Sequence, residues 1–459
     1  MKSLPADPLG GITLGEFGLR LRRGEITSES ATRAYLERTA LLEPRIGAFV
    51  HVANDLGLAQ ARAIDRLLAS GTDLGPLMGV PIAVKDLLTV DGMPRPTCGS
   101  NVDISDLVGP EGEFVRRLKR AGCVILGKTR MTEFAFGLVN VIHPTPWNPT
   151  DPRVHRMPGG SSSGSAAALA AGMCAFSIGS DTGGSVRQPA ALCGLFGYKS
   201  TFGMWPTDGT FPLSTTLDSL GTFADSAKDA ALAFAALTAR PVPPPKRLKG
   251  LRLGRPTNHY FDDLSPEVAT ATEDALRALR DAGVEIVPIE VPEAAEIDTV
   301  FGPLLSVELL ATLGSDRFVA SREILDPVVW NRAEPMLGFR AIDYVRARRR
   351  QVELCEIARE KMCGLDGWVT PTTPDPPVPL ADYRTPEKAA GWIRRGTHNT
   401  RPANMFGQCG VSLPIPSPGL PVGLQIVCAP GEDARLLSIS QSLEELLGRR
   451  VRPDMSAFL

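Results

Sequence analysis

Residues 159–187 read GGSSSGSAAALAAGMCAFSIGSDTGGSVR, and this stretch carries the strongest fold signal in the chain. It begins with a glycine–serine loop (159–165) and continues into a run of small apolar residues (166–172) that predicts a helix packed very close to its neighbours. The apolar segment 175–180 predicts a buried strand. The stretch ends in DTGGSVR at 181–187, where two glycines let the backbone turn sharply. We therefore expect a loop, a helix, a strand and a tight turn in succession.

The same alternation of helix and strand is present before this stretch. Residues 80–84 (VPIAV) form a short apolar run that predicts a buried strand ending at Lys85. Residues 114–120 predict a helix, and residues 123–127 (CVILG) predict another buried strand. Short buried strands that alternate with helices are typical of an α/β protein whose sheet is largely covered.

Domain organisation is indicated by one linker-like stretch, RPVPPP at residues 240–245. A new strand is predicted soon after it, at 251–253, so we interpret it as a surface crossover inside one large domain, 1–459. A split into two domains at this point is the alternative. Under our interpretation the chain has an N-terminal helical segment, a core, a proline-rich crossover and a C-terminal part, at about 12–70, 71–240, 241–250 and 251–459.

The composition excludes several classes of function. The chain has 459 residues, of which 43% are hydrophobic and 22% charged, and its net charge is −2. Without a basic stripe, nucleic acid and anionic membrane are excluded as main partners. The N-terminus lacks the apolar core of a signal peptide, and no apolar run reaches about 18 residues, so we expect a cytoplasmic protein. None of the five histidines lies in a metal-binding pattern, and we expect neither a metal nor a cofactor.

The glycine–serine loop has several interpretations. Such a sequence is typical of a linker or of the N-terminal cap of a helix. Phosphate binding is disfavoured because the loop lacks the Gly-Lys-Ser/Thr ending of a phosphate-binding loop. Gly160, Ser162 and Gly164 also match G-x-S-x-G, the nucleophile elbow, which must follow a buried strand. Residues 151–158 are polar and contain two prolines, so they cannot form that strand and the elbow is excluded.

The turn at 181–187 suits a different chemistry. Its consecutive N–H groups can converge on one point, as in an oxyanion hole, and a serine at the end of such a nest is well placed to attack a carbonyl. Ser185 is the candidate nucleophile, and the candidate donors are Thr182, Gly183, Gly184 and Ser185. The alternative is a simple turn in which Ser185 caps a helix. Asp181 and Arg187 can form an ion pair that braces the turn, or else a surface pair of little energetic value.

A serine nucleophile needs a base, and few histidines are present to supply one. A lysine can serve if burial lowers its pKa, because a low-dielectric environment disfavours the ammonium form. Lys85 follows the mostly apolar residues 81–84, which would hold the stem of its side chain inside the sheet. The alternative is a lysine whose charge is solvated at the surface, as most lysines are.

Taken together, these segments resemble the amidase signature family. The resemblance rests on GVPIAVKD (79–86), GGSSSGS (159–165) and DTGGSVRQPA (181–190). Five flanking segments are similar as well, so that the resemblance extends from about residue 10 to residue 450: LGKTRMTEFA, WNP, GYKSTFG, TPTTP and GLPVGLQIV. It implies a single large α/β domain with a central mixed, mostly parallel twisted β-sheet that is covered by α-helices on both faces.

The resemblance also implies a role for each matching residue. Lys85 would be the neutral base, and Ser162 would be the proton relay, which in this family sits on a cis peptide bond. Ser185 would form the acyl-enzyme, while the N–H groups of 182–185 hold the developing oxyanion. Ser163 stands where the family often has glycine, a small change that leaves the relay serine in place.

A motif near residue 400, Thr400-x-Pro402-x-Asn404, is also similar to the family's. It is followed by GQCG at 407–410 where Gly-Leu-Pro is common, which predicts altered packing beside the substrate pocket.

The implied function is an amidohydrolase that cleaves carboxamide C–N bonds in a small-molecule amide or carbamate, as a monomer or homodimer. The alternative is the A subunit of the glutamine-dependent tRNA amidotransferase, which usually has an acidic residue just before the motif near 400. Residues 396–399 (GTHN) contain no carboxylate, which favours the stand-alone hydrolase. A non-catalytic binding protein on the same scaffold is disfavoured because all three candidate triad residues are present.

Residues 293–350 match the family least. Their large apolar side chains suit a lid or pocket wall for an apolar acyl or aryl group, and an ordinary helical layer is the alternative. A pocket wall would make aryl amides, anilides or carbamates good substrates. The side chains concerned are Phe301, Leu304, Leu305, Trp330, Met336, Leu337 and Phe339.

Overall fold

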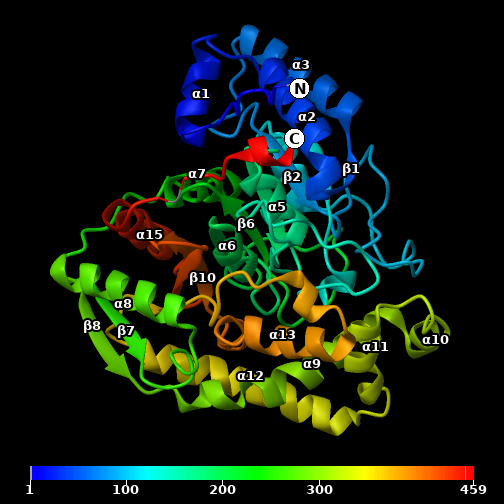
Figure 1. Cartoon of the computed structure of the whole chain (residues 1–459), viewed down its shortest axis with the longest axis vertical. Helices are drawn as coiled ribbons and strands as arrows, with labels where there is room; N and C mark the ends of the chain where they lie inside the picture. The colour runs from blue at the N-terminus through cyan, green and yellow to red at the C-terminus, as the bar shows by residue number, and fades with distance from the viewer. Residues whose placement is uncertain (1–2, 450) are drawn as a thin grey trace.

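The computed structural model describes residues 3–449 and 451–459, and it is organised around one eleven-stranded sheet (Figure 1). The strands lie in the order β1-β3-β2-β4-β6-β5-β10-β11-β9-β7-β8. Their bounds are β1 Phe49–Val52, β2 Pro81–Lys85, β3 Val124–Thr129, β4 Phe176–Ser180, β5 Phe196–Lys199, β6 Leu220–Ala224, β7 Arg252–Pro256, β8 Glu285–Ile289, β9 Gly367–Pro371, β10 Cys409–Ile415 and β11 Val422–Cys428. The strands predicted before residues 85, 128 and 181 are therefore present as β2, β3 and β4.

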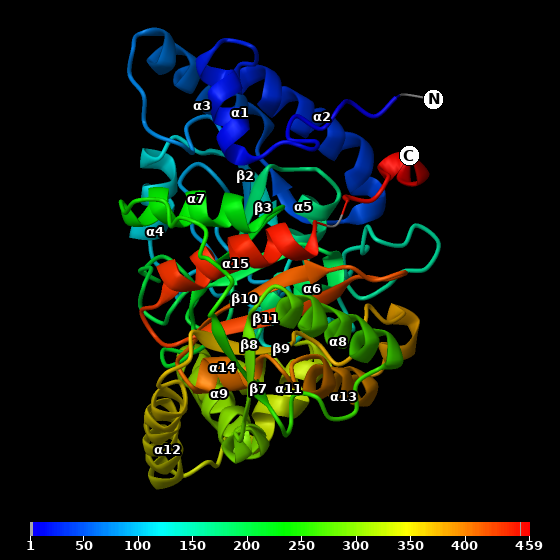
Figure 2. The ribbon, with the colours of Figure 1, turned by 90° about the vertical axis from the view of Figure 1, so that its left-hand side faces the viewer.

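Helices surround this sheet (Figure 2). Their bounds are α1 Leu14–Arg22, α2 Ser28–Ile46, α3 Asn54–Ala69, α4 Glu113–Arg120, α5 Ser163–Ala170, α6 Arg187–Cys193, α7 Ala227–Thr238, α8 Pro266–Asp281, α9 Ile297–Leu313, α10 Ser315–Ala320, α11 Pro327–Ala333, α12 Ala341–Lys361, α13 Pro386–Gly396, α14 Arg401–Met405 and α15 Asp433–Leu447. Within the described ranges, none of these helices combines the length and the apolar character that a bilayer crossing requires.

The sheet is mixed, as expected, but it is not mostly parallel. Parallel pairing is limited to β2 with β3 and β4, and to β7 with β8 and β9. The other six pairings between the named strands are antiparallel. The reason is visible in the connections: β10 and β11 are joined by the short turn 416–421, and a parallel pair would need a longer crossover.

Helices cover both faces of the sheet, as we expect from the sequence. On β5, Gly197 and Tyr198 point to opposite faces because successive strand residues alternate. A Cβ added at Gly197 would lie 2.5 Å from the Cβ of Ala190, so α6 packs on that face. The hydroxyl of Tyr198 donates to Asp433 of α15 at 2.7 Å, and its ring packs edge-on against Phe234 of α7. The helices α7 and α15 therefore cover the other face.

Helix α5 is the close-packed helix that the small residues predict, and every one of its residues is buried. A Cβ added at Gly164 would lie 2.2 Å from the carbonyl oxygen of Ala48 and 2.6 Å from the backbone nitrogen of Arg130. Only a residue without a side chain fits there. The helix can thus lie directly on neighbouring backbone and hold the preceding loop against the strand ends.

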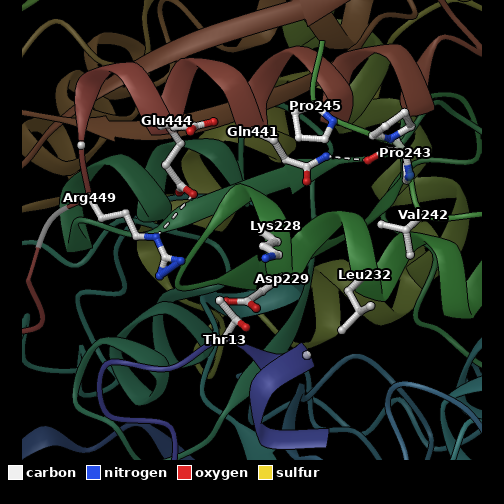
Figure 3. Close-up of a pocket in the computed structure, with 14 residues that line it drawn as sticks. Thr13, Lys228, Asp229, Leu232, Val242, Pro243, Pro245, Gln441, Glu444 and Arg449 are labelled. Atoms are coloured by element: carbon white, nitrogen blue, oxygen red, sulfur yellow. Dashed lines mark hydrogen bonds and ion pairs between the residues drawn. The ribbon is translucent and has the colours of Figure 1, made fainter. Parts of the chain in front are cut away.

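The proline-rich crossover passes beside α7 and α15 (Figure 3). Gln441 of α15 donates its Nε2–H to the carbonyl of Pro243 at 2.7 Å, and a cavity of about 660 Å³ lies between these segments and the start of α1. Strands from before and after the crossover belong to the same sheet. The chain therefore folds as one large domain and does not divide there.

The close packing of α5 can be tested with Gly164→Ala. We expect this change to lower the free energy of unfolding by about 1–3 kcal/mol, because the added methyl overlaps backbone atoms that cannot rotate away. The matched control is Gly391→Ala within α13, where nothing lies within 4 Å of an added Cβ. Alanine should stabilise that helix by about 0.5–1 kcal/mol. Urea unfolding followed by circular dichroism measures both, and equal stabilities for the two variants would contradict the packing.

Candidate active site

The parallel strands β2 and β4 bring the candidate site together at one edge of the sheet. Because they are parallel neighbours, their carboxyl ends meet at the same edge. Strand β2 ends at Lys85 and β4 ends at Ser180. The turn 181–187 follows β4 directly, and the glycine–serine loop reaches the same edge because α5 packs against β4 and β2.

Lys85 is fully buried at this edge. Its Nζ donates to the hydroxyl oxygen of Ser161 at 2.6 Å and to that of Ser180 at 2.8 Å. Burial lowers the pKa of Lys85 to about 7, although the nearby carboxylates of Asp218 and Asp181 act in the opposite direction. Much of this amine is therefore uncharged near neutral pH, which is the state that a general base needs.

The expectation that Ser162 contacts Lys85 is wrong. The hydroxyl oxygen of Ser162 accepts from the backbone N–H of Ser180 at 3.3 Å, and the same hydroxyl donates to the carbonyl of Ser180, also at 3.3 Å. The cis peptide bond implied by the family lies at Gly160–Ser161, one residue earlier than expected. Ser162 occupies the position directly before α5 but makes no capping hydrogen bond to the helix. Its hydroxyl is instead held by the backbone of Ser180 at the end of β4, while the preceding serine faces the lysine.

Asp181 and Arg187 form a fully buried ion pair at 2.8 Å, so the weak surface pair is excluded. The carboxylate of Asp181 also accepts from the backbone N–H groups of Gly184, Val186 and Arg187. Burial opposes the ionisation of Asp181, but Arg187, Lys199 and Asn404 together hold the pKa of this carboxyl well below its usual range. The pair therefore fixes the shape of the turn from inside.

The C-terminal half of the chain supplies the remaining partners of this ion pair. The guanidinium of Arg187 donates to the carbonyl of Thr400 at 3.0 Å, to Gln425 Oε1 at 2.7 Å and to Asn404 Oδ1 at 2.6 Å. Asn404 donates in turn to Asp181 Oδ1 at 3.0 Å. These contacts connect the motif near residue 400 to the turn.

Gly184 does not belong among the candidate oxyanion donors, contrary to expectation. Its N–H donates to Asp181 Oδ1 at 2.9 Å and is therefore occupied. Its φ is +120°, and an added Cβ would lie 2.0 Å from the hydroxyl oxygen of Thr400, so only glycine fits. In the described part of the chain, no acceptor is found for the N–H groups of the other three candidates, Thr182, Gly183 and Ser185. These three N–H groups stay available to donate hydrogen bonds to a ligand.

Ser185 lines a narrow cleft with about 30 Å³ of free volume. Of the seven apolar side chains expected in a lid or pocket wall, Phe301 and Leu305 line this cleft. The other five are absent from its lining; Trp330, for example, stacks on Phe318 at 4.8 Å between ring centroids. Residues 407–410 do not line it either, so the altered packing expected there lies away from the cleft.

Sequence reasoning missed several residues of this site. It named no role for Ser180, or for the two cleft arginines, Arg332 and Arg401. Gln425 left a signal, because it is a lone polar residue within the otherwise apolar strand β11. By contrast, nothing in the sequence of three consecutive serines indicates that Ser161 is the one that contacts Lys85.

A buried lysine in contact with serine hydroxyls lies beside a cleft lined by Ser185, an arrangement suited to the chemistry of a hydrolase. Among the residues that the structure describes, no cluster of three or more His, Cys, Asp or Glu side chains is arranged to hold a metal. The family named Amidase matches residues 30–437. The chain therefore belongs to the Amidase family, and it is an enzyme that hydrolyses C–N bonds of amides.

Individual known proteins are similar over nearly the whole chain. The 2-amino-5-chloromuconic acid deaminase of Comamonas testosteroni is 38% identical, covering 95% of this chain and 96% of that protein. The A subunit of the glutamyl-tRNA(Gln) amidotransferase of Heliobacterium modesticaldum is 33% identical, covering 95% of this chain and 97% of that protein. A crystal structure described as an amidase is 29% identical with a TM-score of 0.87, covering 95% of this chain and all of that one.

The importance of the buried ion pair can be tested with Arg187→Met. Removing the guanidinium leaves Asp181 charged and buried, so we expect the free energy of unfolding to fall by about 3–5 kcal/mol. The control is Arg340→Met, which removes an ion pair with Asp343 whose arginine side chain is 71% exposed. Urea unfolding should show no measurable change for that control. Similar midpoints for both variants and the wild type would refute the bracing role.

Proposed function

We propose that this protein hydrolyses amides through an acyl-enzyme formed on Ser185, with Ser161 as the proton relay and Lys85 as the base. The observation that carries the proposal is the 2.6 Å contact between the buried amine of Lys85 and the hydroxyl of Ser161. The amine is held near its titration point by burial. In this proposal, Ser161 takes the proton-relay role that the family resemblance implies for Ser162.

Proximity of the relay loop to Ser185 is supported by Gln188, three residues further along the chain. Its Oε1 accepts from the backbone N–H of Gly160 at 3.0 Å. A Cβ added at Gly159 would lie 2.7 Å from the Cα of Pro189, so the loop packs tightly on the start of α6. The loop that carries Ser161 is thereby tied to the turn that carries Ser185.

In the first half of the reaction, uncharged Lys85 accepts the proton of the Ser161 hydroxyl while Ser161 accepts the proton of Ser185. The Ser185 oxygen attacks the substrate carbonyl carbon and forms a tetrahedral oxyanion. The N–H groups of Thr182, Gly183 and Ser185 stabilise that charge, each donor contributing about 3–4 kcal/mol in comparable sites. Gly184 supports the hole by holding the turn and donates no hydrogen bond to the substrate.

In the second half, Ser161 gives its proton to the leaving nitrogen and regains one from the Lys85 ammonium. Without this protonation an amine is too poor a leaving group to depart. The C–N bond breaks and the acyl group stays on Ser185. Water then attacks the ester by the reverse proton path and releases the carboxylic acid.

We infer that the substrates are small molecules and that the protein acts in the cytoplasm, as a monomer or homodimer. Phe301 and Leu305 give the cleft an apolar wall, which supports aryl amides and anilides, and carbamates would use the same nucleophile and oxyanion hole. The alternative, the A subunit of a tRNA amidotransferase, would release ammonia from glutamine. Thr397 lines the cleft but its neighbours at 396–399 offer no carboxylate for the glutamine amino group, which supports the stand-alone hydrolase.

The relay assignment can be tested by comparing Ser161→Ala with Ser162→Ala. We expect Ser161→Ala to lower kcat by about 10²- to 10⁴-fold, the usual contribution of a general acid–base group. Ser162→Ala, which removes a hydroxyl bonded only to backbone, should lower it less than about tenfold. Hydrolysis of a p-nitroanilide measures both, with Ser185→Ala as the inactive reference. The reverse order of the two losses would restore Ser162 as the relay.

The pH dependence follows from the lowered pKa of Lys85. The base must be deprotonated, so kcat/KM should rise with pH and level off above about 7, where the amine has lost its proton. The measurement is kcat/KM for a neutral amide between pH 5 and 9. A profile that is flat over this range, or that is still rising steeply at pH 9, would show that Lys85 is not the titrating base.

A further inference from the structure

Two arginines line the cleft beside Ser185, and the proposed hydrolysis of a neutral amide group uses neither. Arg332 comes from α11 and Arg401 from the start of α14. Helix α11 packs on both α9 and α13, which lie near it in Figure 1, and each of these three helices contributes side chains to the lining of the cleft. Charged side chains are rarely placed in a narrow, largely apolar cleft unless they bind a partner.

Arg401 is only 5% exposed and keeps unused hydrogen-bonding capacity. Its Nη1 donates to Asp298 Oδ1 at 2.5 Å and its Nη2 donates to the carbonyl of Ile393 at 3.0 Å. Its Nε is buried and, across the described residues, has no hydrogen-bond partner. The Cγ of Arg401 would lie 3.6 Å from a Cβ added at Gly183, so the side chain passes directly beside the proposed oxyanion loop.

Arg332 has no carboxylate partner within the described ranges. Its Nη1 donates to the carbonyl of Phe136, and its guanidinium lies 4.0 Å from the centre of the Phe136 ring. Burial and the positive charge of Arg401 lower the pKa of Arg332 to about 9, so that each of the two charges is destabilised by its surroundings. An anion between or beside them would relieve both effects.

The charges around the cleft do not balance. Arg332, Arg401 and the exposed Arg394 act on one another, and Asp298 is the carboxylate that opposes them. Asp298 is itself half exposed and already paired with Arg401. The cleft therefore has an excess of positive charge next to the nucleophile, a field that attracts and orients anionic substrates.

We propose that Arg332 and Arg401 form a carboxylate-binding subsite, so that the preferred substrate is an amide whose acyl part carries a second, ionised carboxyl group. This inference rests on the proposed amide hydrolysis at Ser185 and adds the substrate class. A guanidinium is suited to the role because its planar donors match the two oxygens of a carboxylate. A relative that is 38% identical is named for 2-amino-5-chloromuconic acid, itself an acid, which supports an anionic substrate.

The test compares matched amides that differ in the carboxylate. The probes are the monoamides of succinic, glutaric, adipic and terephthalic acids, each against the neutral amide with a methyl group in place of the carboxylate. For at least one pair we expect kcat/KM to favour the carboxylate by about tenfold or more, chiefly through KM, with the preference weakening as salt is added. In Arg332→Gln and in Arg401→Gln that ratio should fall about tenfold, and Arg332→Lys should retain part of it.

The matched control is Arg322→Gln, because Arg322 also stacks on an aromatic ring, that of Trp330 at 5.2 Å, but does not line the cleft. Its ratio should equal that of the wild type. For each variant, kcat/KM on the carboxylate probe is divided by kcat/KM on the matched neutral probe. Labelling of Ser185 by a fluorophosphonate shows that the variant is folded. If Arg401→Gln fails to fold, Arg332→Gln decides, since Arg332 forms no hydrogen bond or ion pair with the described turn 181–187, its side chain donating to the carbonyl of Phe136.

Three outcomes would overturn the inference while leaving amide hydrolysis intact. The first is a wild type that hydrolyses the neutral amide faster in every pair. The second is a carboxylate-to-neutral ratio of kcat/KM that stays unchanged in both Arg332→Gln and Arg401→Gln. The third is a loss of this ratio in Arg322→Gln equal to that in the two cleft variants. A wild type that hydrolyses no amide of either kind, and whose Ser185 the fluorophosphonate does not label, would instead refute the proposed function itself.

Discussion

The site depends on the burial of one amine. Lys85 ends a central strand, is fully enclosed, and has two serine hydroxyls as its hydrogen-bond partners. Desolvation makes the ammonium form expensive in this position, and hydroxyl oxygens compensate only part of that loss. Burial of an amine usually destabilises a fold, but here it favours the uncharged amine, which can accept a proton near neutral pH.

The fold holds the site in place by hydrogen bonds that connect both halves of the chain to the turn 181–187. The Asp181–Arg187 pair occupies the interior of the turn, and its outer hydrogen bonds go to Thr400, Asn404 and Gln425. A buried pair of this kind adds little stability compared with apolar packing, but it specifies one geometry because each donor has one acceptor. Within the turn, the N–H of Gly184 donates to the carboxylate, while Thr182, Gly183 and Ser185 line the cleft.

Much of the fold was predictable from the sequence, because short apolar runs and small-residue helices have distinctive patterns. The strand ending at Lys85, the helix after the glycine–serine loop and the turn at 181–187 all lie where the sequence predicts them. Strand direction was not predictable for strands that do not follow one another in the chain, since antiparallel pairs such as β4 with β6 depend on which runs pair in space. The contact of Ser161 with Lys85 was missed for a related reason: the side chains of three consecutive serines point in different directions, and only the backbone conformation sets those directions. The cleft arginines come from segments far apart in sequence, so no local motif marks them.

The most direct test of this account is an NMR titration of the Lys85 side chain in the intact enzyme. Lysine labelled with ¹³C at Cε would be followed from pH 5 to 11, with the Lys85 signal assigned by its absence in Lys85→Met. We expect the Lys85 signal to titrate with a pKa of about 7. A midpoint near 10.4, the value of a solvated lysine, would contradict it, because the amine would then be charged at neutral pH and unable to accept the relay proton.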